Sequence, residues 1–403
     1  MAGQYTNIKR LHEIVRTLIR YGFGSIVAEM NIVPYASALK KLFFFKRSAS
    51  RESVPVRVRL MLEELGPTYI KLGQIASTRA DILPPDWIEE LKKLQDMVPH
   101  EKPEDIRRII EKSLHKPVNS LFSSFNTLPV ASASVAQVHY AELPDGTEVA
   151  IKVRRPHIKN IIEADISVMK QIAALMERYL PSYKRYRPVE VVNEFSRVIH
   201  RELDMKIEGA NIDRFKKMFS GDERIQIPEV YWDYTSEEVL TMERLSGVPM
   251  DEIDLIEEKG LDIKEIAVNG LEIFFKQVFE FGLFHADLHP GNIFVRDDGV
   301  IVYLDFGIVG KLDHNLKKYL ASTLYYLVRE DYHQMAKVHR KMGLIGSHVN
   351  LVEFEEALMD ITEPIHGREL EKINVSALLM KLIDTARRFE MSLQPNLLLL
   401  QKS

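Results

Sequence analysis

Two short motifs in the second half of the chain limit the folds that it can adopt. Asp287 lies five residues before Asn292, and Asp305-Phe306-Gly307 follows after a mostly apolar stretch. The residues between them place an Asp-Asp-Gly turn between two apolar runs, which predicts a hairpin over 293–303 that brings Asn292 and Asp305 together. Amide and carboxylate oxygens are hard ligands of the kind that suits Mg²⁺. The spacing therefore predicts a divalent-cation site close to a second acidic side chain, Asp287.

The order of these groups, Asp then Asn then Asp-Phe-Gly, resembles the metal-and-base set of the protein-kinase-like fold. The resemblance implies that Asn292 and Asp305 bind Mg²⁺ together with ATP phosphates. It also implies that Asp287 is catalytic and accepts a proton from, or orients, the group that attacks the γ-phosphate. We expect His285 to brace this loop through backbone hydrogen bonds rather than to bind a metal.

The other half of a nucleotide site is predicted upstream, around an apolar strand at residues 149–153. Lys152 stands in the middle of that strand, where burial without an anionic partner is costly, so we expect it to face phosphates. The alternative is a strand-edge lysine that extends to water. Residues 130–138 are rich in Ala and Ser and occupy the position where kinases keep a Gly-rich loop over the phosphates. Because Ala excludes the positive-φ conformations open to Gly, we expect a stiffer loop.

Proline and turn residues predict several other elements. Helices are expected to start at Pro85 and at Pro103, because proline suits the first turn of a helix. The turn at Pro144-Asp145-Gly146 predicts a hairpin, and short strands are expected near 226–231 and 237–243.

Further motifs accompany these groups: Lys71-Leu72-Gly73-Gln74, the Ala-rich residues 131–134, and Glu202-Leu203-Asp204. Together with the two motifs described first, they resemble the UbiB family of atypical kinase-like proteins, which is linked to ubiquinone biosynthesis. Bacterial members look especially similar, since three more stretches match theirs, at residues 64–67, 77–79 and 385–389. The resemblance covers nearly all of the chain.

The family pattern implies a role for each matching position. Lys152 contacts ATP phosphates, with Glu208 as its ion-pair partner on the same predicted helix as Glu202. Lys71 and Gln74, on an N-terminal extension, reach into the active site, with Lys71 near Glu202. The implied supporting residues are thus Lys71, Gln74, Glu202, Asp204 and Glu208. The remaining implied ATP contacts come from the loop and from a hinge at 240–245: Val130, Ala131, Ser132, Ala133, Ser134, Val135, Ala136, Gln137, Val138, Met242 and Glu243.

The helix predicted at about 187–219 also bears on Glu202. Apolar residues at helical spacing share its face, namely Val191, Phe195, Val198 and Met205. A carboxylate on such a face needs a partner or a raised pKa, whereas the alternative is a half-exposed glutamate at a helix edge. A second E-x-D, Glu163-Ala164-Asp165, lies in a different predicted helix, and we prefer Glu202.

Two differences from ordinary protein kinases bear on the substrate. Ala286 stands where those enzymes keep an Arg that orders a phosphorylated activation loop, and no Ala-Pro-Glu follows Asp-Phe-Gly in the corresponding context. Residues 308–312 lead almost directly into a helical pattern at 314–329, so little chain remains for a peptide-docking platform. This favours an ATPase, or a kinase for a small lipid-like molecule. The motif at 285–292 also resembles small-molecule phosphotransferases of the aminoglycoside and choline kinase type.

Composition narrows the function further. A net charge of −4 over 403 residues is not the basic charge typical of nucleic-acid-binding proteins, so we expect no nucleic-acid partner. The absence of cysteine excludes disulfides, thiolate metal ligands and cysteine catalysis. No signal peptide is evident at the N-terminus.

Charge is concentrated at the N-terminal end. Residues 1–60 hold eleven Lys or Arg against three Glu, and residues 40–47 place three aromatic side chains between two basic pairs. Ile8, Leu11, Val15 and Leu18 share one face of a predicted helix that also carries Lys9, Arg10, Arg16 and Arg20. Such segments suit an anionic membrane surface. The alternative is that these helices pack on the kinase core and their basic residues form a solvated face.

No apolar run in the chain is long enough to span a bilayer. Bacterial relatives continue into hydrophobic C-terminal segments, whereas this chain ends just after a Leu run at 397–400. We therefore expect the natural protein to continue to a membrane anchor. The predicted location is the cytoplasmic face of the bacterial inner membrane.

The sequence thus predicts an α+β, protein-kinase-like two-lobed fold. Residues 1–125 form a helical N-terminal extension, 126–245 an N-lobe and 246–403 a mostly helical C-lobe. The predicted function is that of a Mg²⁺-dependent ATPase or atypical kinase that supports ubiquinone biosynthesis and acts on or presents polyprenyl lipid intermediates. The alternatives are a small-molecule or lipid phosphotransferase, and a non-enzymatic nucleotide-sensing scaffold. The expected partners are anionic membrane lipids, polyprenyl-quinone intermediates and other ubiquinone-biosynthesis proteins.

Overall fold

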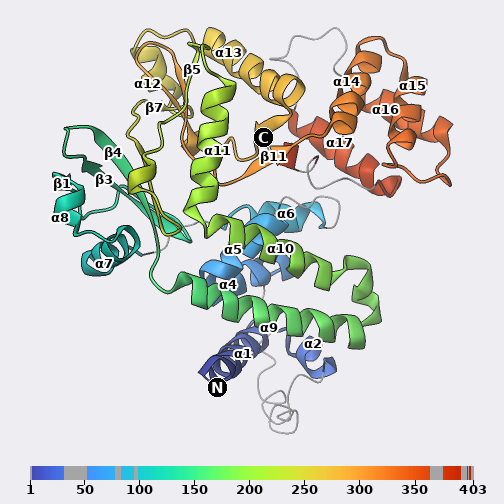
Figure 1. The fold of residues 1–403 in the computed structure, drawn as a ribbon. Helices are drawn as coiled ribbons and strands as arrows, with labels where there is room; N and C mark the ends of the chain where they lie inside the picture. Colours follow the sequence, from blue (N-terminus) through green and yellow to red (C-terminus); the bar gives the residue numbers. More distant parts are fainter. Residues whose placement is uncertain are drawn as a thin grey trace. The chain divides into compact units, whose positions relative to one another are not determined.

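The computed structural model describes residues 2–30, 52–77, 83–94, 99–363, 375–391, 397, 399 and 400. The chain forms two compact units (Figure 1). The first comprises the described residues within 1–77, 83–217 and 227–245, and the second those within 218–226 and 246–403. The predicted separation of an extension from an N-lobe, both within the first unit, stays a prediction.

The first unit contains an antiparallel sheet. Its strands are β1 (Ser124–Phe125), β2 (Ala131–Ser132), β3 (Ala136–Glu142), β4 (Glu148–Arg154) and β6 (Val239–Glu243). The order is β1-β3-β4-β6, and β2 also pairs with β3. Gly146 has a φ of +88°, which suits glycine, and allows the tight turn that joins β3 to β4 at the predicted place. All of β4 after Glu148 is buried, as expected for a central strand.

The other described elements of the first unit are helices. They are α1 (Ala2–Arg20), α2 (Gly24–Glu29), α4 (Val54–Leu65), α5 (Pro67–Ala76), α6 (Pro85–Leu91), α7 (Pro103–Leu114), α8 (Val118–Leu121), α9 (Ile158–Tyr179), α10 (Pro188–Glu202) and α11 (Met205–Met218), with 3₁₀ turns at Pro181–Tyr186 and Trp232–Tyr234. Of these, α7 and α8 pack on the sheet, while most of the others pack on one another (Figure 1). The predicted starts at Pro85 and Pro103 are confirmed, because proline fits the first turn, where its missing N–H costs nothing. Residues of α7 pack with those of β4 in one core cluster, including Ile106, Ile110 and Ile151.

The single helix predicted at about 187–219 is wrong. The chain breaks at Leu203 and Asp204, and Glu202 ends α10 whereas Glu208 lies in α11. The side chain of Asp204 accepts the backbone N–H of Lys206 at 3.0 Å, which starts α11 as an N-cap residue does. The apolar stripe of α10 is also shifted by one residue, to Val192, Phe195 and Ile199, and Glu202 remains in phase with it.

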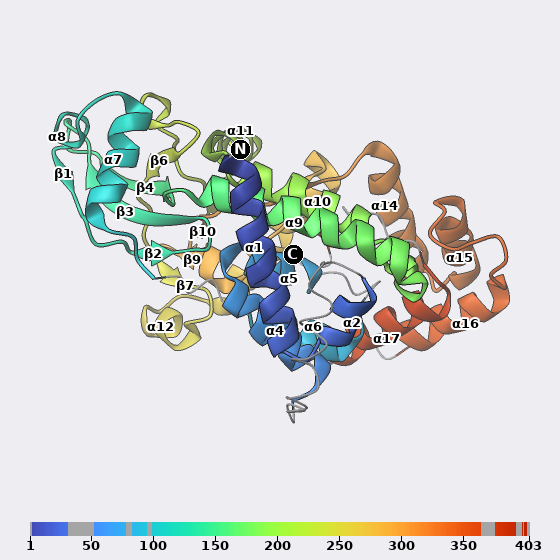
Figure 2. The same cartoon turned by 90° about the horizontal axis from the view of Figure 1, so that it is seen from below.

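The N-terminal helix packs inside the first unit. Its buried residues include Ile14 and Val15, and α1 packs across α9 (Figure 2). Arg10 donates to both carboxylate oxygens of Asp165, a residue of α9 that is 0% exposed. The packing alternative therefore holds for α1, and Arg10 is not a membrane-facing charge. The basic and aromatic stretch at 40–47 lies outside the described residues.

The second unit contains two small sheets. One has the order β5-β10-β9-β7, from Ile225–Gln226, Ile301–Tyr303, Ile293–Val295 and Val248–Pro249, and the other pairs β8 (Leu283–His285) with β11 (Val309–Lys311). The β5 strand pairs in parallel with β10, so the N-lobe strand predicted near 226–231 is wrong apart from an isolated bridge at Val230.

Helices make up most of the rest of the second unit: α12 (Ile253–Glu258), α13 (Ile263–Phe275), α14 (His314–Val328), α15 (Tyr332–Lys341), α16 (Leu351–Thr362) and α17 (Val375–Arg388), with a π-helical turn at Lys276–Phe281 and a 3₁₀ turn at Pro290–Asn292. Leu397, Leu399 and Leu400, from the C-terminal Leu run, pack against the core residues Phe284 and Ala286. The predicted α+β class is confirmed.

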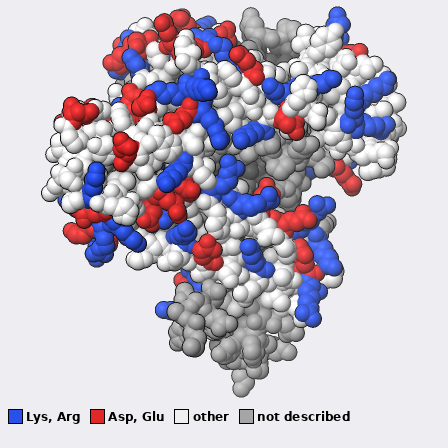
Figure 3. Space-filling view, viewed as in Figure 1, with Lys and Arg blue, Asp and Glu red and all other residues white. Residues whose placement is uncertain are grey.

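The surface shows no single dominant charge on the face drawn in Figure 3, where Lys and Arg side chains are interspersed with Asp and Glu. Within the described part of the chain, none of the helices combines the length and the apolar character needed to cross a membrane.

Candidate active site

The predicted catalytic hairpin is present in the second unit. Strands β9 and β10 pair antiparallel, with Ile293 opposite Tyr303, and Gly299 (φ +81°) lies in the connecting turn. The N–H of Leu304 donates to the carbonyl of Asn292 at 3.1 Å. The pairing therefore brings Asn292 and Asp305 to the same end of the hairpin, as the spacing predicted.

Hydrogen bonds to the backbone hold the side chains of Asn292 and Asp305 at this end of the hairpin. The amide nitrogen of Asn292 donates to the carbonyl of Asp287 at 3.1 Å, which leaves the amide oxygen as its remaining polar atom. One carboxylate oxygen of Asp305 accepts the N–H of Gly307 at 2.8 Å. An amide oxygen and a carboxylate at one end of a hairpin are a donor set that fits Mg²⁺. Among the described residues, no three His, Cys, Asp or Glu side chains cluster in a metal-binding arrangement, so phosphates and water would have to complete the coordination.

His285 braces the catalytic loop, as predicted. Its Nε2 contacts the carbonyl of Asp305, and its Nδ1 accepts the N–H of Asp287 at 3.2 Å. These partners require a neutral ring with the proton on Nε2. The ring is 0% exposed, and burial lowers the pKa of His285 from its ordinary value, which favours this neutral form. One imidazole thereby links the backbone of both acidic residues.

Sequence reasoning missed Gln277, which orients His285. Its side-chain oxygen accepts the backbone N–H of His285 at 2.9 Å, and its amide nitrogen donates to the hydroxyl of Tyr303 at 3.4 Å. Gln277 is 0% exposed and lies in the π-helical turn at Lys276–Phe281. A polar residue within the apolar run 273–279 was the available signal, but the π-helical turn that aims it has no signature in the sequence.

In the first unit, the structure brings together Lys152 and Glu208. The ammonium lies 2.9 Å from a carboxylate oxygen, and the two side chains are 11% and 7% exposed. The strand-edge alternative for Lys152 therefore does not hold. The carboxylate holds the Lys152 side chain in one place, which suits a phosphate-binding lysine.

The Ala-rich loop is only partly accessible. Val130 and Ala131 are exposed, Ser132, Ala133 and Val138 are half-buried, and the residues between them are buried, namely Ser134, Val135, Ala136 and Gln137. The amide of Gln137 is used inside the protein, where its oxygen accepts the N–H of Glu101 at 3.0 Å. Of the nine loop residues predicted to contact ATP, these four could therefore contribute little beyond backbone groups.

The K-x-G-Q motif lies on α5, and its Lys and Gln side chains contact two different parts of the first unit. Lys71 forms an ion pair with Glu202 at 3.2 Å, as the resemblance implies, and both side chains are largely buried. Gln74 instead donates to the carbonyl of Leu94, inside the helical N-terminal region. A Cβ at Gly73 would lie 2.3 Å from Leu94 and 2.8 Å from Leu62, so this glycine lets α5 pack closely.

The predicted hinge residues Met242 and Glu243 lie in strand β6. They pair with β4 on one side, and on the other the N–H of Glu243 donates to the carbonyl of Glu229 at 2.8 Å. This N–H is therefore already engaged within the sheet. The prediction that Met242 and Glu243 contact ATP stays a prediction, and this one N–H would not be available for such a contact.

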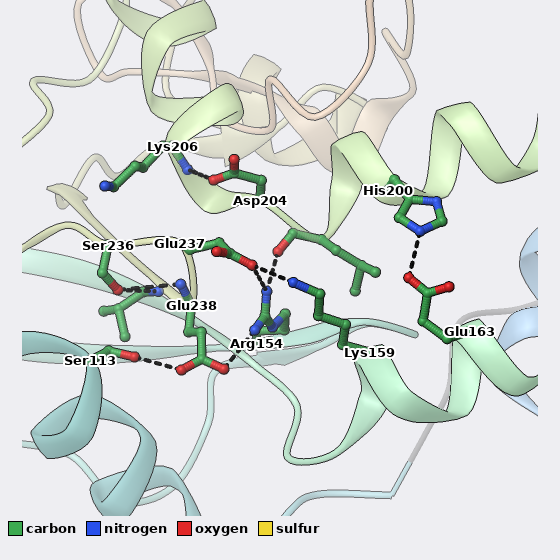
Figure 4. Close-up of polar contacts among 12 residues, drawn as sticks. Ser113, Arg154, Lys159, Glu163, His200, Asp204, Lys206, Ser236, Glu237 and Glu238 are labelled. Atoms are coloured by element: carbon green, nitrogen blue, oxygen red, sulfur yellow. Dashed lines mark hydrogen bonds and ion pairs between the residues drawn. The ribbon is translucent and has the colours of Figure 1, made fainter. Parts of the chain in front are cut away.

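Arg154 is a second residue that sequence reasoning missed, although it follows Lys152 by only two positions. Its guanidinium donates to the carbonyl of Leu203 and to the carboxylates of Glu237 and Glu238 (Figure 4). The signal for Arg154 in the sequence was a pair of consecutive arginines at the end of an apolar strand.

The second E-x-D motif makes different contacts. Asp165 binds Arg10, whereas Glu163 binds His200 at 2.7 Å.

Comparison with known proteins gives consistent matches. Residues 93–339 match the model of the ABC1 atypical kinase-like domain, and residues 358–403 match the UbiB helical domain. A protein of Marinobacter nauticus named probable protein kinase UbiB is 47% identical over 351 residues, which is 86% of this chain and 64% of that protein. One of the same name from Aeromonas salmonicida is 42% identical over 401 residues, 98% of this chain and 73% of that protein.

A solved structure supports the fold. The complex of Rv3197 with erythromycin from Mycobacterium tuberculosis superposes with a TM-score of 0.56 at 26% identity. The match covers 88% of this chain and 91% of that one.

Proposed function

The chain belongs to the UbiB family of ABC1 atypical kinase-like proteins, and from that premise we propose that it is a Mg²⁺-dependent ATPase or atypical kinase that supports ubiquinone biosynthesis. One observation carries the proposal. His285 links the backbones of Asp287 and Asp305, while the hairpin sets Asn292 beside Asp305. A loop with only a structural task has no need for two fixed oxygen donors and a further carboxylate.

Each residue has a defined task in the proposed reaction. Asn292 and Asp305 would hold Mg²⁺, and the ion would neutralise phosphate charge. Asp287 orients the nucleophile or accepts its proton. Lys152, fixed by Glu208, binds the nucleotide phosphates. Lys71 and Glu202 form a second ion pair, which supports the same α10–α11 corner from the helical extension.

The proposed acceptor is water or a small lipid-like molecule rather than a protein. After Gly307 the chain forms only the three-residue strand β11 before α14 begins at His314. This leaves little chain for a peptide-docking surface of the kind that protein kinases build after Asp-Phe-Gly. Polyprenylated intermediates at the cytoplasmic face of the inner membrane fit the proposed role in ubiquinone biosynthesis. The basic and aromatic sequence at 40–47 suits anionic lipids.

The test is phosphate release from ATP and Mg²⁺ by the 403-residue chain, with and without anionic liposomes. We expect release that rises with liposomes, and a loss of about 100-fold or more in Asp287→Asn, because the carboxylate that orients the nucleophile is gone. Asp297→Asn is the matched control: this exposed aspartate of the same hairpin pairs only peripherally with Lys259 and should leave the rate unchanged.

Two results would redirect the proposal. Nucleotide binding without release in the unchanged chain points to the phosphotransferase alternative, which needs an acceptor that the assay omits. Full cellular function of Asp287→Asn contradicts catalysis and favours the nucleotide-sensing scaffold.

A further inference from the structure

Arg155 makes contacts that the proposed reaction does not use. It follows the last residue of β4, and its side chain is only 3% exposed. Its guanidinium group donates four hydrogen bonds to the residues named here. Nε donates to the carbonyl of Ala133 at 2.8 Å, and one terminal nitrogen donates to the hydroxyl of Ser132 at 2.7 Å. The other terminal nitrogen donates to the carbonyl of Pro99 at 2.8 Å and to the carboxylate of Glu101 at 2.7 Å.

These partners belong to two separate segments. Ser132 and Ala133 lie in the Ala-rich loop, whereas residues 99–101 precede α7 and follow the helical N-terminal region. The backbone N–H of Arg155 also donates to the carbonyl of Val135, further along the loop, at 2.9 Å. Arg155 therefore forms hydrogen bonds with three residues of the loop and with two residues of the 99–101 segment.

A second set of bonds joins the same two segments without Arg155. The side chain of Gln137, at the end of the loop, accepts the N–H of Glu101 and contacts Nε2 of the fully buried His139 at 2.8 Å. Nδ1 of His139 contacts the carbonyl of Asn126 at 2.9 Å. The 99–101 segment is thus held to the sheet at Gln137 and to the loop at Arg155.

The chemistry of arginine explains why this position matters. A buried guanidinium is stable only where its donors are satisfied, and its planar fork fixes the direction of each hydrogen bond. A lysine would bring the same charge but no fork, so it could not reach the loop carbonyl, the Ser132 hydroxyl and Glu101 at once. The geometry therefore favours a single loop conformation.

We infer that Arg155 is a positioning residue that holds the Ala-rich loop against the 99–101 segment, and that the affinity for nucleotide depends on this connection. The inference rests on the proposed nucleotide site. When the loop is already ordered, nucleotide binding loses little conformational entropy. When the loop is released, only the fraction of molecules whose loop has the binding-competent conformation can bind nucleotide, and the apparent affinity falls by that fraction.

The experiment uses the full 403-residue chain and compares Arg155→Lys and Arg155→Met with the unchanged protein. Hydrogen exchange of the nucleotide-free proteins is the first readout, and titration with ATP and Mg²⁺ is the second. We expect faster exchange at residues 133–137 and at Glu101, unchanged protection in β4, and nucleotide binding about tenfold weaker, if the competent fraction falls to about one tenth. Arg108→Lys, at an arginine whose side chain is 76% exposed, is the control and should change neither readout.

Glu101→Ala keeps the test decisive if Arg155 variants do not fold. The side chain of Glu101 is 28% exposed, so its truncation removes the acceptor for Arg155 without opening the core. We expect faster exchange within the Ala-rich loop, although residue 101 lies outside it. Folded variants with unchanged loop exchange and unchanged affinity would overturn the inference. Failure of the unchanged chain to bind nucleotide contradicts the proposed function instead, while the exchange data still decide whether Arg155 holds the loop.

Discussion

Arg154 donates a hydrogen bond of 2.7 Å to the carbonyl of Leu203, the C-cap residue that follows the end of α10. The bond ties the end of β4 to the corner between α10 and α11. Glu202 lies immediately before this corner and Glu208 shortly after it, so the position of both carboxylates depends on where the corner is held. Figure 4 shows Arg154 between the carboxylates of Glu237 and Glu238, which balance its buried charge.

Replacement of Arg154 should therefore destabilise the first unit. Arg154→Met keeps the apolar stem but leaves the carbonyl of Leu203 without this donor, and we expect the free energy of unfolding to fall by about 2 kcal/mol. Denaturant titration measures the change. Lys159→Met is the matched control, because Lys159 shares Glu237 but is about half exposed, and such surface pairs contribute no more than about 1 kcal/mol. Equal losses in both variants would contradict a special role for the corner.

The buried pair of Lys152 and Glu208 leads to a different prediction. Glu208→Gln leaves the ammonium without its countercharge, and we expect a loss of unfolding free energy of about 3 kcal/mol. Lys152→Met combined with Glu208→Gln should cost less than the sum of the single changes, because no buried charge is then left uncompensated. A double-mutant cycle measured by denaturant titration gives the coupling. Strict additivity of the two changes would show that the ions do not interact.

The two E-x-D motifs should respond in opposite ways. Asp165→Asn removes the countercharge of Arg10 at a fully buried position, so stability should fall by about 2–4 kcal/mol. Nucleotide affinity of the remaining folded protein should be unchanged. Glu202→Gln alters the partner of Lys71 at the α10–α11 corner, so there we expect changed nucleotide affinity. Parallel thermal unfolding and ATP titration distinguish the two, and a change of affinity in Asp165→Asn contradicts this division.

Local patterns explain what the sequence could predict. The hairpin at 293–303, the strand that carries Lys152 and the helix starts at Pro85 and Pro103 each depend on a few neighbouring residues. The break at Leu203 was missed because no Gly or Pro marks it and apolar spacing continues through it. Asp204 was the available signal, since Asp is a favoured N-cap residue.

Contacts between distant segments explain what could not be predicted. Arg155 reaches residues 22 to 56 positions earlier in the chain, and Arg10 reaches Asp165 across 155 positions. No periodicity in the sequence specifies such partners. The same limit applies to Glu243, whose backbone N–H is engaged only because the chain near Glu229 returns to the free edge of β6.

The contact of His200 with Glu163 makes a small part of the stability depend on pH. The carbonyl of Ser196 and, after it, the carboxylate of Glu163 raise the pKa of His200 above its ordinary value, against the opposing effects of partial burial and Lys170. Because the folded state binds this proton more tightly, the contribution of His200 to stability is fully present below the unfolded-state pKa of about 6.5. It is lost as pH rises through the raised folded-state pKa.

His200→Gln should therefore lower the free energy of unfolding in mildly acidic buffer by no more than about 1 kcal/mol, as expected for a partly exposed pair. In alkaline buffer the same substitution should have almost no effect. Glu163→Gln should give a smaller loss with the same pH dependence, because the carbonyl of Ser196 remains. Equal losses of stability for His200→Gln in both buffers would show that protonation of this imidazole does not contribute.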